Sequence, residues 1–472
     1  MTIEFSKKLT ARETPIPGVV LYDLPVHGDN RGWFKENWQR EKMIAAGLPD
    51  FGPVQNNISF NDKAGTTRGI HAEPWDKFVS VATGRIFGAW VDLREGPSFG
   101  AVFTTELDAS KAIFIPRGVA NSYQTLEDNT SYVYLVNDHW SPDAEYTFLN
   151  LADETANIPW PIPLSEAEVS EKDLGHPRLA EVRPMGPRKT LVLGADGQLG
   201  RALRKAYDGD TSVEFAGRQD FDLLDPESYT ARHWGSYSTI INAAAYTAVD
   251  AAETGPGREA AWAINATAVS RLARVAAEHS LTLVHVSSDY VFDGERPEHT
   301  EDEPFTPLGV YGQSKAAGDA IAGTVPRHYI VRTSWVIGDG NNFVRTMAAL
   351  AGRGVQPSVV DDQIGRLTFA EDIAEGIKHL LATKSPFGTY NLSNDGTPQS
   401  WAEIAADVFE LSGAERSVVS GVTTAEYFKD KAAAPRPLNR VLDLAKIKAT
   451  GFTPRNSKTA LAEYLSTSQA TV

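Results

Sequence analysis

The pattern of hydrophobic and polar positions changes character near residue 185. Before that point, short apolar runs are separated by Gly, Pro, Asn and Asp, as in RIFGAWVDLREG, AIFIPRG and SYVYLVNDHWSP. This rhythm is typical of an all-β sandwich or jelly roll. After that point, apolar runs such as KTLVLGA, STIINAAA and LTLVHVSS alternate with Ala-rich helical stretches. The alternation predicts βαβ units around a parallel sheet.

The pattern therefore predicts a multidomain chain. We expect a β-rich domain over residues 1–180, a linker over 181–188 and an α/β domain over 189–472. The linker prediction rests on the proline-rich, charged stretch HPRLAEVRPMGPRK. From about residue 345, the helical patterns FVRTMAALAGRG and WAEIAADVFELSG predict a small lobe that closes over the α/β domain.

Composition narrows the class of protein. The chain is 42% hydrophobic and 22% charged, which is ordinary for a globular protein. It has no apolar run long enough to span a bilayer, and its N-terminus lacks the apolar core of a secretory signal, so we expect no membrane partner. The absence of cysteine excludes disulfides and thiolate chemistry and fits the cytoplasm. A net charge of −16 argues against nucleic acid as the main partner.

A glycine-rich motif, GADGQLG at 194–200, follows the apolar run TLVLG and opens a helical pattern. We expect Gly194 to permit a tight turn, Gly197 to let the backbone approach a diphosphate and Gly200 to allow close packing of helix on strand. The free N–H groups of the helix N-terminus then face the anion. The spacing G-x-x-G-x-x-G is usual in extended short-chain dehydrogenases. A glycine turn without a ligand is the alternative.

Three side chains fit hydride delivery to a ketone. Tyr311 and Lys315 in YGQSK are four residues apart, which places them on one helix face. The lysine cation can lower the tyrosine pKa and hydrogen-bond a cofactor ribose. Ser288 ends the apolar strand LTLVHVS, at the edge where α/β sheets bind ligands, and can orient a substrate carbonyl. The alternative for the Tyr–Lys pair is a solvated helix face.

Residues 189–472 resemble the dTDP-4-dehydrorhamnose reductases through GADGQLG, DLLDP, INAAAYTAVDAAE, VSSDYVFDG, PLGVYGQSK, VRTSWV, GNNF and DDQIGRLT. The resemblance implies a Rossmann fold of the extended short-chain dehydrogenase type, with Tyr311 as proton donor to the C4 alkoxide and Lys315 as its support. Ser288 and Asp289 would contact the sugar. Trp335 would pack against the substrate, or belong to the core. The implied cofactor contacts are Gly194, Gly197, Gln198, Leu199, Gly200, Arg218, Asp222, Leu223, Ala244, Ala245, Tyr246, Tyr311 and Lys315.

The choice of cofactor depends on Arg218, which lies in AGR at the end of the predicted second strand. An arginine at this place can accept a 2′-phosphate, which favours NADPH. NADH stays open, because Arg218 could equally be a surface charge.

In the β-rich domain, RGIH places Arg68 and His71 close together. A lone histidine is more often structural than catalytic. His27, His71, His139 and His176 are scattered along the sequence without a His-x-His pair, so we expect no metal.

Residues 15–178 resemble the dTDP-4-dehydrorhamnose 3,5-epimerases through GDNRGWFKE, VQNNIS, RGIH, VDLREGPSFG, FIPRGVANSY, YVYLVNDHWSP and SEKD. The resemblance implies a cupin-like jelly roll and a homodimer. It implies His71 as the base, Asp173 as its partner, Tyr134 as proton donor on the opposite sugar face and Lys77 as the cation facing the enolate oxygen. The implied substrate contacts are Arg31, Glu36, Gln55, Asn57, Arg68 and Glu145, with Arg31 and Arg68 suited to the diphosphate.

This domain departs from the family pattern at two positions. Gly88 stands where the family usually has aspartate, and Asn121 stands where it usually has histidine. The stretch between His71 and Lys77 is also shorter than is typical. These changes remove a carboxylate and an imidazole from the expected pocket.

The sequence thus predicts a bifunctional enzyme acting on a dTDP-sugar. The first domain would epimerise dTDP-4-keto-6-deoxy-D-glucose at C3 and C5, and the second would reduce the C4 ketone to give dTDP-L-rhamnose. One alternative is a non-catalytic N-terminal domain that binds a sugar nucleotide or dimerises. Another is a related deoxysugar made by epimerisation at a single carbon.

Overall fold

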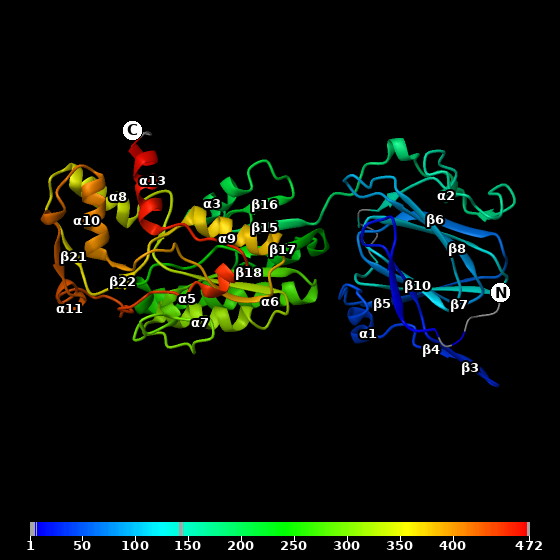
Figure 1. Cartoon of the computed structure of the whole chain (residues 1–472), viewed down its shortest axis with the longest axis horizontal. Coiled ribbons are helices and arrows are strands. Elements are labelled where there is room, and N and C mark those ends of the chain that lie inside the picture. The colour runs from blue at the N-terminus through cyan, green and yellow to red at the C-terminus, as the bar shows by residue number, and fades with distance from the viewer. Residues whose placement is uncertain (1–4, 6, 141–143, 145, 470–472) are drawn as a thin grey trace. The chain divides into compact units, whose positions relative to one another are not determined.

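The structure is a computed structural model that describes residues 5, 7–140, 144 and 146–469. The chain divides into two compact units, Met1–Arg188 and Lys189–Val472 (Figure 1). Each unit has hydrophobic clusters of its own.

Strands dominate the N-terminal unit and form two larger sheets in its described part. The first sheet contains, in spatial order, β1 (Thr10–Glu13), β2 (Val20–Asp23), β10 (Lys111–Ile115), β7 (Lys77–Thr83), β12 (Thr130–Val136) and β5 (Gln55–Asn61). The second contains β13 (Thr147–Phe148), β6 (Thr66–Ala72), β11 (Val119–Thr125), β8 (Ile86–Asp92) and β9 (Val102–Leu107), with β14 (Glu168–Val169) also paired to β6. A hairpin of β3 (Val26–Asp29) and β4 (Gly32–Lys35) and the helices α1 (Arg40–Ala45) and α2 (Glu171–Leu174) complete the unit. The predicted strand-rich domain is confirmed.

The two sheets enclose a core, because alternate residues of each strand point to the same face. Val79 of β7 and Ile113 of β10 belong to one buried cluster with Trp90 of β8 and Tyr123 of β11. The strands that carry the chemistry are therefore held by apolar contacts between the sheets.

The segment 181–188, which the sequence assigns to a linker, is attached to the N-terminal unit. Val182 and Met185 are buried in the same cluster as Leu93. The N–H of Met185 donates to the carbonyl of Leu93 at 2.8 Å, and its carbonyl accepts from the N–H of Glu95 at 3.0 Å. This proline-rich segment therefore packs along the β-rich unit, which ends at Arg188.

In residues 189–469, all of which are described, the main sheet is parallel. Its strands are, in spatial order, β16 (Val213–Ala216), β15 (Lys189–Leu193), β17 (Tyr237–Asn242), β18 (Thr282–Ser288), β19 (His328–Thr333) and β24 (Gly388–Asn391). All five pairings are parallel, which confirms the predicted α/β alternation. The order reverses direction between β15 and β17, and parallel sheets bind ligands at such a point.

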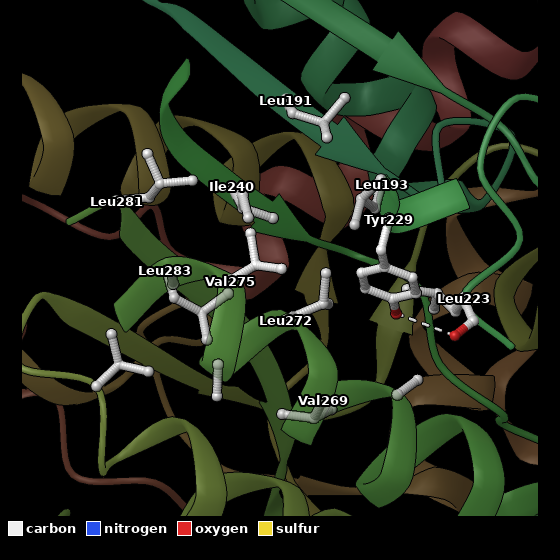
Figure 2. Packing of buried hydrophobic residues seen from close by; sticks show 14 of the residues in the cluster. Leu191, Leu193, Leu223, Tyr229, Ile240, Val269, Leu272, Val275, Leu281 and Leu283 are labelled. Atoms are coloured by element: carbon white, nitrogen blue, oxygen red, sulfur yellow. Dashed lines mark hydrogen bonds between the residues drawn. The ribbon is translucent and has the colours of Figure 1, made fainter. Parts of the chain in front are cut away.

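Helices cover both faces of this sheet (Figure 1). On one face lie α3 (Gln198–Ala206) and α9 (Ala370–Ala382), and on the other lie α6 (Ala268–Glu278) and α7 (Val310–Ala322). Figure 2 shows the second interface, where Leu191, Ile240 and Leu283 of the sheet pack against Leu272 and Val275 of α6. The ends of the strands are thereby fixed relative to α7. Two shorter helices, α4 (Pro226–Thr230) and α5 (Gly255–Trp262), lie in the sequence between β16 and α6.

A smaller lobe has its own hydrophobic cluster. Its helices include α8 (Phe343–Gly352), α10 (Trp401–Leu411) and α13 (Ser457–Gln469), and the first two agree with the helical patterns in the sequence. The short strands of this region are β20 (Val336–Ile337), β21 (Ser358–Val360), β22 (Ile364–Gly365), β23 (Thr368–Phe369), β25 (Gln399–Ser400) and β26 (Ser420–Val422), with the short helix α11 (Thr424–Tyr427). The short helix α12 (Ala445–Ala449) packs on the parallel sheet through Ile447. Among the described helices, none is both long and apolar enough to cross a membrane.

Candidate active sites

A pocket of about 480 Å³ in the N-terminal unit is bordered by both sheets and by α2. It gathers His71, Lys77, Tyr134, Asp173 and Arg68, which are five of the residues singled out in the sequence. The other lining residues are Ser59, Thr66, Thr67, Gly69, Glu73, Asn121, Tyr123, Tyr132, Glu168, Val169 and Ser170.

The imidazole of His71 and the carboxylate of Asp173 form the central pair of this pocket. His71 Nε2 lies 3.0 Å from Asp173 Oδ1, and the N–H of Gly69 donates to Asp173 Oδ2 at 3.3 Å. Asp173 is held on α2, whose N-cap Ser170 accepts from the Asp173 N–H. Burial raises the pKa of Asp173, but the hydrogen bond and charge of His71, helped by Gly69, outweigh burial and lower it. An ionised Asp173 can therefore stabilise His71 in its protonated form.

A cation and a phenol face the same pocket. Lys77 is only 5% exposed, forms an ion pair with Glu73 and has its Nζ 5.2 Å from the ring centroid of Tyr134. Burial, and then the charge of Glu73, raise the pKa of Tyr134, so the phenol keeps its proton near neutral pH. The pocket thus combines a base, a buried cation and a protonated acid.

The two departures from the family pattern are linked in space by Trp90. A Cβ atom at Gly88 would lie 2.3 Å from the Cη2 atom of Trp90, so the indole fills the space that a side chain at position 88 would need. The indole Nε1–H donates to Oδ1 of Asn121 at 3.0 Å, and the hydroxyl of Tyr132 donates to the same oxygen at 3.0 Å. Since the indole nitrogen is only a donor, these bonds fix the orientation of the Asn121 amide.

His176, to which the sequence analysis gave no role, lies beside the central pair. Its ring centroid lies 5.3 Å from that of His71, and its Nε2 lies 3.9 Å from Asp173 Oδ1. The possible ligand atoms of these three residues lie within 4.8 Å of one another, so two of the four histidines, His71 and His176, are close in space although they are far apart in sequence. Burial, and then the charge of His71, lower the pKa of His176. In the sequence, the one indication that His176 belongs near the site is its position three residues after Asp173.

Other predicted substrate contacts lie outside this lining. Arg31 pairs with Asp29 on the β3–β4 hairpin, and Glu36 pairs with Lys42. Gln55 Nε2 donates to Asn57 Oδ1 at 2.8 Å on β5. Glu145 lies outside the described residues.

A second pocket, of about 660 Å³, lies in the C-terminal unit at the ends of the parallel strands. It gathers most of the predicted cofactor and sugar contacts. Its lining is Gly194, Asp196, Gly197, Gln198, Leu199, Arg218, Ala243, Ala244, Ala245, Thr247, Val249, Val286, Ser287, Ser288, Asp289, Tyr290, Tyr311, Lys315, Thr333, Ser334, Trp335, Val336, Ile373, Trp401 and Arg440.

The glycine motif forms the turn between β15 and α3. Gly194 has a φ of +76°, and a Cβ there would lie 2.7 Å from the backbone nitrogen of Ala244, so both its conformation and its surroundings require glycine. Gly197 is the N-cap of α3 and makes no side-chain cap, which leaves the first N–H groups of the helix free. Gly200 packs against the carbonyl of Gly194. These N–H groups fit an anion such as a dinucleotide diphosphate.

Tyr311 and Lys315 lie on α7 and are both deeply buried. Burial raises the pKa of Tyr311, while contacts with Ser288 and the charge of Arg440 act in the opposite direction. The Nζ of Lys315 donates to the carbonyl of Val286 at 2.7 Å, and burial lowers the Lys315 pKa to about 8. Burial is the largest influence on the Tyr311 pKa, and the raised pKa means that the phenol carries its proton at neutral pH.

Asp289 is the centre of a small polar cluster beside Tyr311. Ser288 Oγ donates to its Oδ1 at 2.9 Å, and Ser334 Oγ donates to its Oδ2 at 2.7 Å. Arg440 Nη1 lies 3.6 Å from the same Oδ2. The sequence analysis assigned no role to Ser334, although it lies in the quoted stretch VRTSWV beside Trp335, or to Arg440, which lies in none of the quoted stretches.

The remaining predicted contacts divide into two groups. Arg218 lines the pocket, is largely exposed and lies 3.7 Å from Asp222, while Trp335 lines it and stacks on Trp401 at 3.8 Å between ring centroids. The structure does not bring every predicted cofactor contact to this lining; those it places elsewhere are Gly200, Asp222, Leu223 and Tyr246.

Each of the two units matches the model of a known protein family. A family model described as "RmlD substrate binding domain" matches residues 188–470, and one described as "dTDP-4-dehydrorhamnose 3,5-epimerase" matches residues 13–181. The chain belongs to both families.

Relatives of each half are close. A "Protein RmlC homolog" of Streptococcus pyogenes is 53% identical over 192 residues, which is 39% of this chain and 96% of the relative. A dTDP-4-dehydrorhamnose reductase of Aggregatibacter actinomycetemcomitans is 37% identical over 291 residues, or 58% of this chain and 97% of the relative. The crystal structure of a dTDP-4-dehydrorhamnose reductase from Bacillus anthracis in complex with NADP is 32% identical, with a TM-score of 0.54, and covers 59% of this chain and 98% of that one.

Proposed function

We propose that this chain is a bifunctional enzyme of dTDP-L-rhamnose synthesis. The N-terminal unit epimerises dTDP-4-keto-6-deoxy-D-glucose at C3 and C5, and the C-terminal unit reduces the C4 ketone of the product. The observation that carries the proposal is that each unit has a pocket which collects a complete set of groups for its step. Membership of both families supports the same two activities.

In the epimerase pocket, His71 removes a proton from the carbon beside the C4 ketone. The C–H electrons move into the enolate, and Asp173 stabilises the imidazolium that forms. Lys77 offsets the negative charge on the enolate oxygen. Tyr134 gives its proton to the opposite face of the same carbon, which inverts the centre. His71 then releases its proton to solvent and Tyr134 takes one up from solvent, after which the same step at the second carbon completes the reaction.

The substrate contacts in this half are assigned by family resemblance. Arg68 lines the pocket and suits the diphosphate. Arg31, Glu36, Gln55, Asn57 and Glu145 are proposed as further contacts to the dTDP-sugar.

In the reductase pocket, the residues fit a dinucleotide with a 2′-phosphate. The free N-terminus of α3 suits its diphosphate, and the exposed guanidinium of Arg218 suits the 2′-phosphate, which favours NADPH. The NADP complex of the Bacillus anthracis relative supports this choice. Bound NADPH supplies a hydride to C4 of the sugar.

The protein's own groups then act on the oxygen at C4. Ser288 and Asp289 hold the sugar, and Tyr311 passes its hydroxyl proton to that oxygen, with Lys315 as the supporting cation. Trp335 is proposed to pack against the sugar ring. The protonated state of the buried Tyr311 suits this role.

Fold type and assembly are further parts of the proposal. We assign the N-terminal unit to a cupin-like jelly roll and the C-terminal unit to a Rossmann fold of the extended short-chain dehydrogenase type. We also propose a homodimer formed through the β-rich unit. Its support is β5, at one end of the first sheet, whose Ile58 and Phe60 are 68% and 54% exposed. The cysteine-free composition supports a cytoplasmic location.

The decisive experiment is product analysis by NMR with dTDP-4-keto-6-deoxyglucose and the full chain in D₂O. Without NADPH, we expect deuterium at both C3 and C5 of the keto sugar. With NADPH, we expect dTDP-L-rhamnose. Reduction without exchange would support a non-catalytic N-terminal unit, and deuterium at one carbon alone would indicate a different deoxysugar.

A further inference from the structure

Arg440 is a buried cation in the reductase pocket that has no assigned role. It is 4% exposed and lines the pocket. Its backbone N–H donates to the carbonyl of Ile364 at 2.8 Å, and its Nε donates to the carbonyl of Pro437 at 3.2 Å. The backbone N–H and the Nε of Arg440 thus hold the side chain in place, while its two Nη atoms donate no hydrogen bond to any described residue.

The neighbours of Arg440 place it at the sugar end of the pocket. Its Nη1 lies 3.6 Å from Asp289 Oδ2, and its guanidinium carbon lies 4.2 Å from the ring centroid of Tyr290. The Tyr290 ring in turn meets the Tyr311 ring edge-on at 5.1 Å. The ring of Tyr290 therefore contacts both the cation and the proposed proton donor.

Proton donation creates an electrostatic problem in this place. When the Oη–H bond of Tyr311 breaks and the proton bonds to the C4 oxygen, the electron pair stays on Oη as a phenolate. The phenolate then shares a buried site with the carboxylate of Asp289. Two buried negative charges are costly without a cation. Two buried cations line the pocket here: Lys315, whose ammonium donates one hydrogen bond to the carbonyl of Val286, and Arg440, whose guanidinium lies beside Asp289.

We propose that Arg440 is a positioning residue of the reductase, which holds Asp289 in place and offsets the negative charge that forms on Tyr311. The inference rests on the proposed reductase activity and adds to it a residue outside the Tyr–Lys motif. The charge of Arg440 lowers the pKa of Tyr311, although burial has the larger and opposite effect. Lys315 keeps its proposed supporting role.

The test compares Arg440→Gln and Arg440→Lys in the full chain, with pre-epimerised dTDP-4-keto-L-rhamnose and NADPH. Arg436→Gln is the matched control, because this guanidinium stands on the same segment and pairs with Asp250 at 2.8 Å without lining the pocket. For Arg440→Gln we expect kcat to fall about 100-fold, as when one preorganised electrostatic group is lost. The KM for NADPH should change less than twofold, and calorimetric affinity for dTDP-L-rhamnose less than threefold. Arg440→Lys should recover at least about tenfold of the lost kcat, since it keeps the charge.

Several outcomes would overturn the inference. They are a kcat for Arg440→Gln within threefold of wild type, an Arg440→Lys variant as slow as Arg440→Gln, or a loss confined to the KM for NADPH. If Arg440→Gln folds poorly, Arg440→Met, which keeps the length of the apolar stem, replaces it, and a kcat within threefold of wild type in that variant would equally refute the role. A wild-type chain that does not oxidise NADPH with this substrate would contradict the proposed function itself.

Discussion

The indole Nε1–H of Trp90 donates to Oδ1 of Asn121 at 3.0 Å, and the same indole occupies the space beside Gly88. The glycine and the asparagine are therefore parts of one arrangement. Asn121 also pairs with His71 across strands β11 and β6, so its amide is held next to the proposed base. The features that speak against an active epimerase when the sequence is read alone are compatible with an ordered pocket.

Replacement of Gly88 by alanine tests this arrangement. The new methyl group would clash with the Trp90 ring, and such overpacking costs about 1–3 kcal/mol of unfolding free energy. We expect the unfolding transition of the N-terminal unit, measured by calorimetry, to move to lower temperature. We also expect deuterium exchange into the 4-keto sugar to slow, because Asn121 loses its fixed partner. Gly186→Ala is the control, since the nearest atom to its Cβ position is Glu95 Oε2 at 3.7 Å. Equal stability of the two variants would contradict the packing argument.

The variant His71→Ala is expected to lose the epimerase activity and to keep the reductase activity. Loss of the base should reduce deuterium exchange into the 4-keto sugar by about 10²–10⁴-fold, the range usual for general acid–base groups. Reduction of pre-epimerised substrate should be unchanged. His27→Asn, on the exposed hairpin strand β3, serves as control. Persistent exchange in His71→Ala would make His71 a structural histidine.

The variant Tyr311→Phe is expected to lose the reductase activity and to keep the epimerase activity. The variant keeps the buried ring but has no proton for the C4 oxygen, so NADPH oxidation, followed by absorbance, should fall to background. Deuterium exchange without NADPH should equal that of wild type. The exposed Tyr427 offers a Tyr→Phe control far from the motif in sequence. Retained oxidation in Tyr311→Phe would displace it as proton donor.

The pKa of Asp173 predicts a pH dependence of stability. Its pKa is lowered in the folded chain, chiefly by His71 acting against burial. Its contribution to stability is therefore present above the unfolded value of about 3.9 and is lost as the pH falls through the lower folded value. We expect Asp173→Asn to be less stable than wild type at pH 6 in urea titrations, with the difference shrinking towards pH 3. A difference independent of pH would show that the ionised carboxylate contributes nothing.

Local patterns carried most of the fold prediction. The switch from short β-rich runs to βαβ alternation identified the strand-rich unit and the parallel sheet, because each pattern has its own period. The glycine turn and the YGQSK pair were equally readable, since they are local in sequence. The SEKD stretch suggested Asp173, and the structure places it 3.0 Å from His71.

What the sequence could not provide are contacts between distant segments. Trp90 reads as a strand residue, and only its approach to Asn121 gives it a part in the pocket. Arg440 stands in a loop, and its relation to Asp289 depends on how the chain returns to the sheet. The linker prediction shows the same limit, because proline content does not show that Met185 is buried against the β-rich unit.

The division of the chain into two compact units, each with its own pocket, has a consequence for metabolic control. Translation of one message produces both active sites in equal number, so a cell cannot adjust their ratio through expression. The balance between the two steps is then set by the rate constants of the two sites and by the supply of substrate and NADPH. A change in the relative capacity of the two sites of this chain therefore requires substitutions in one of the two units.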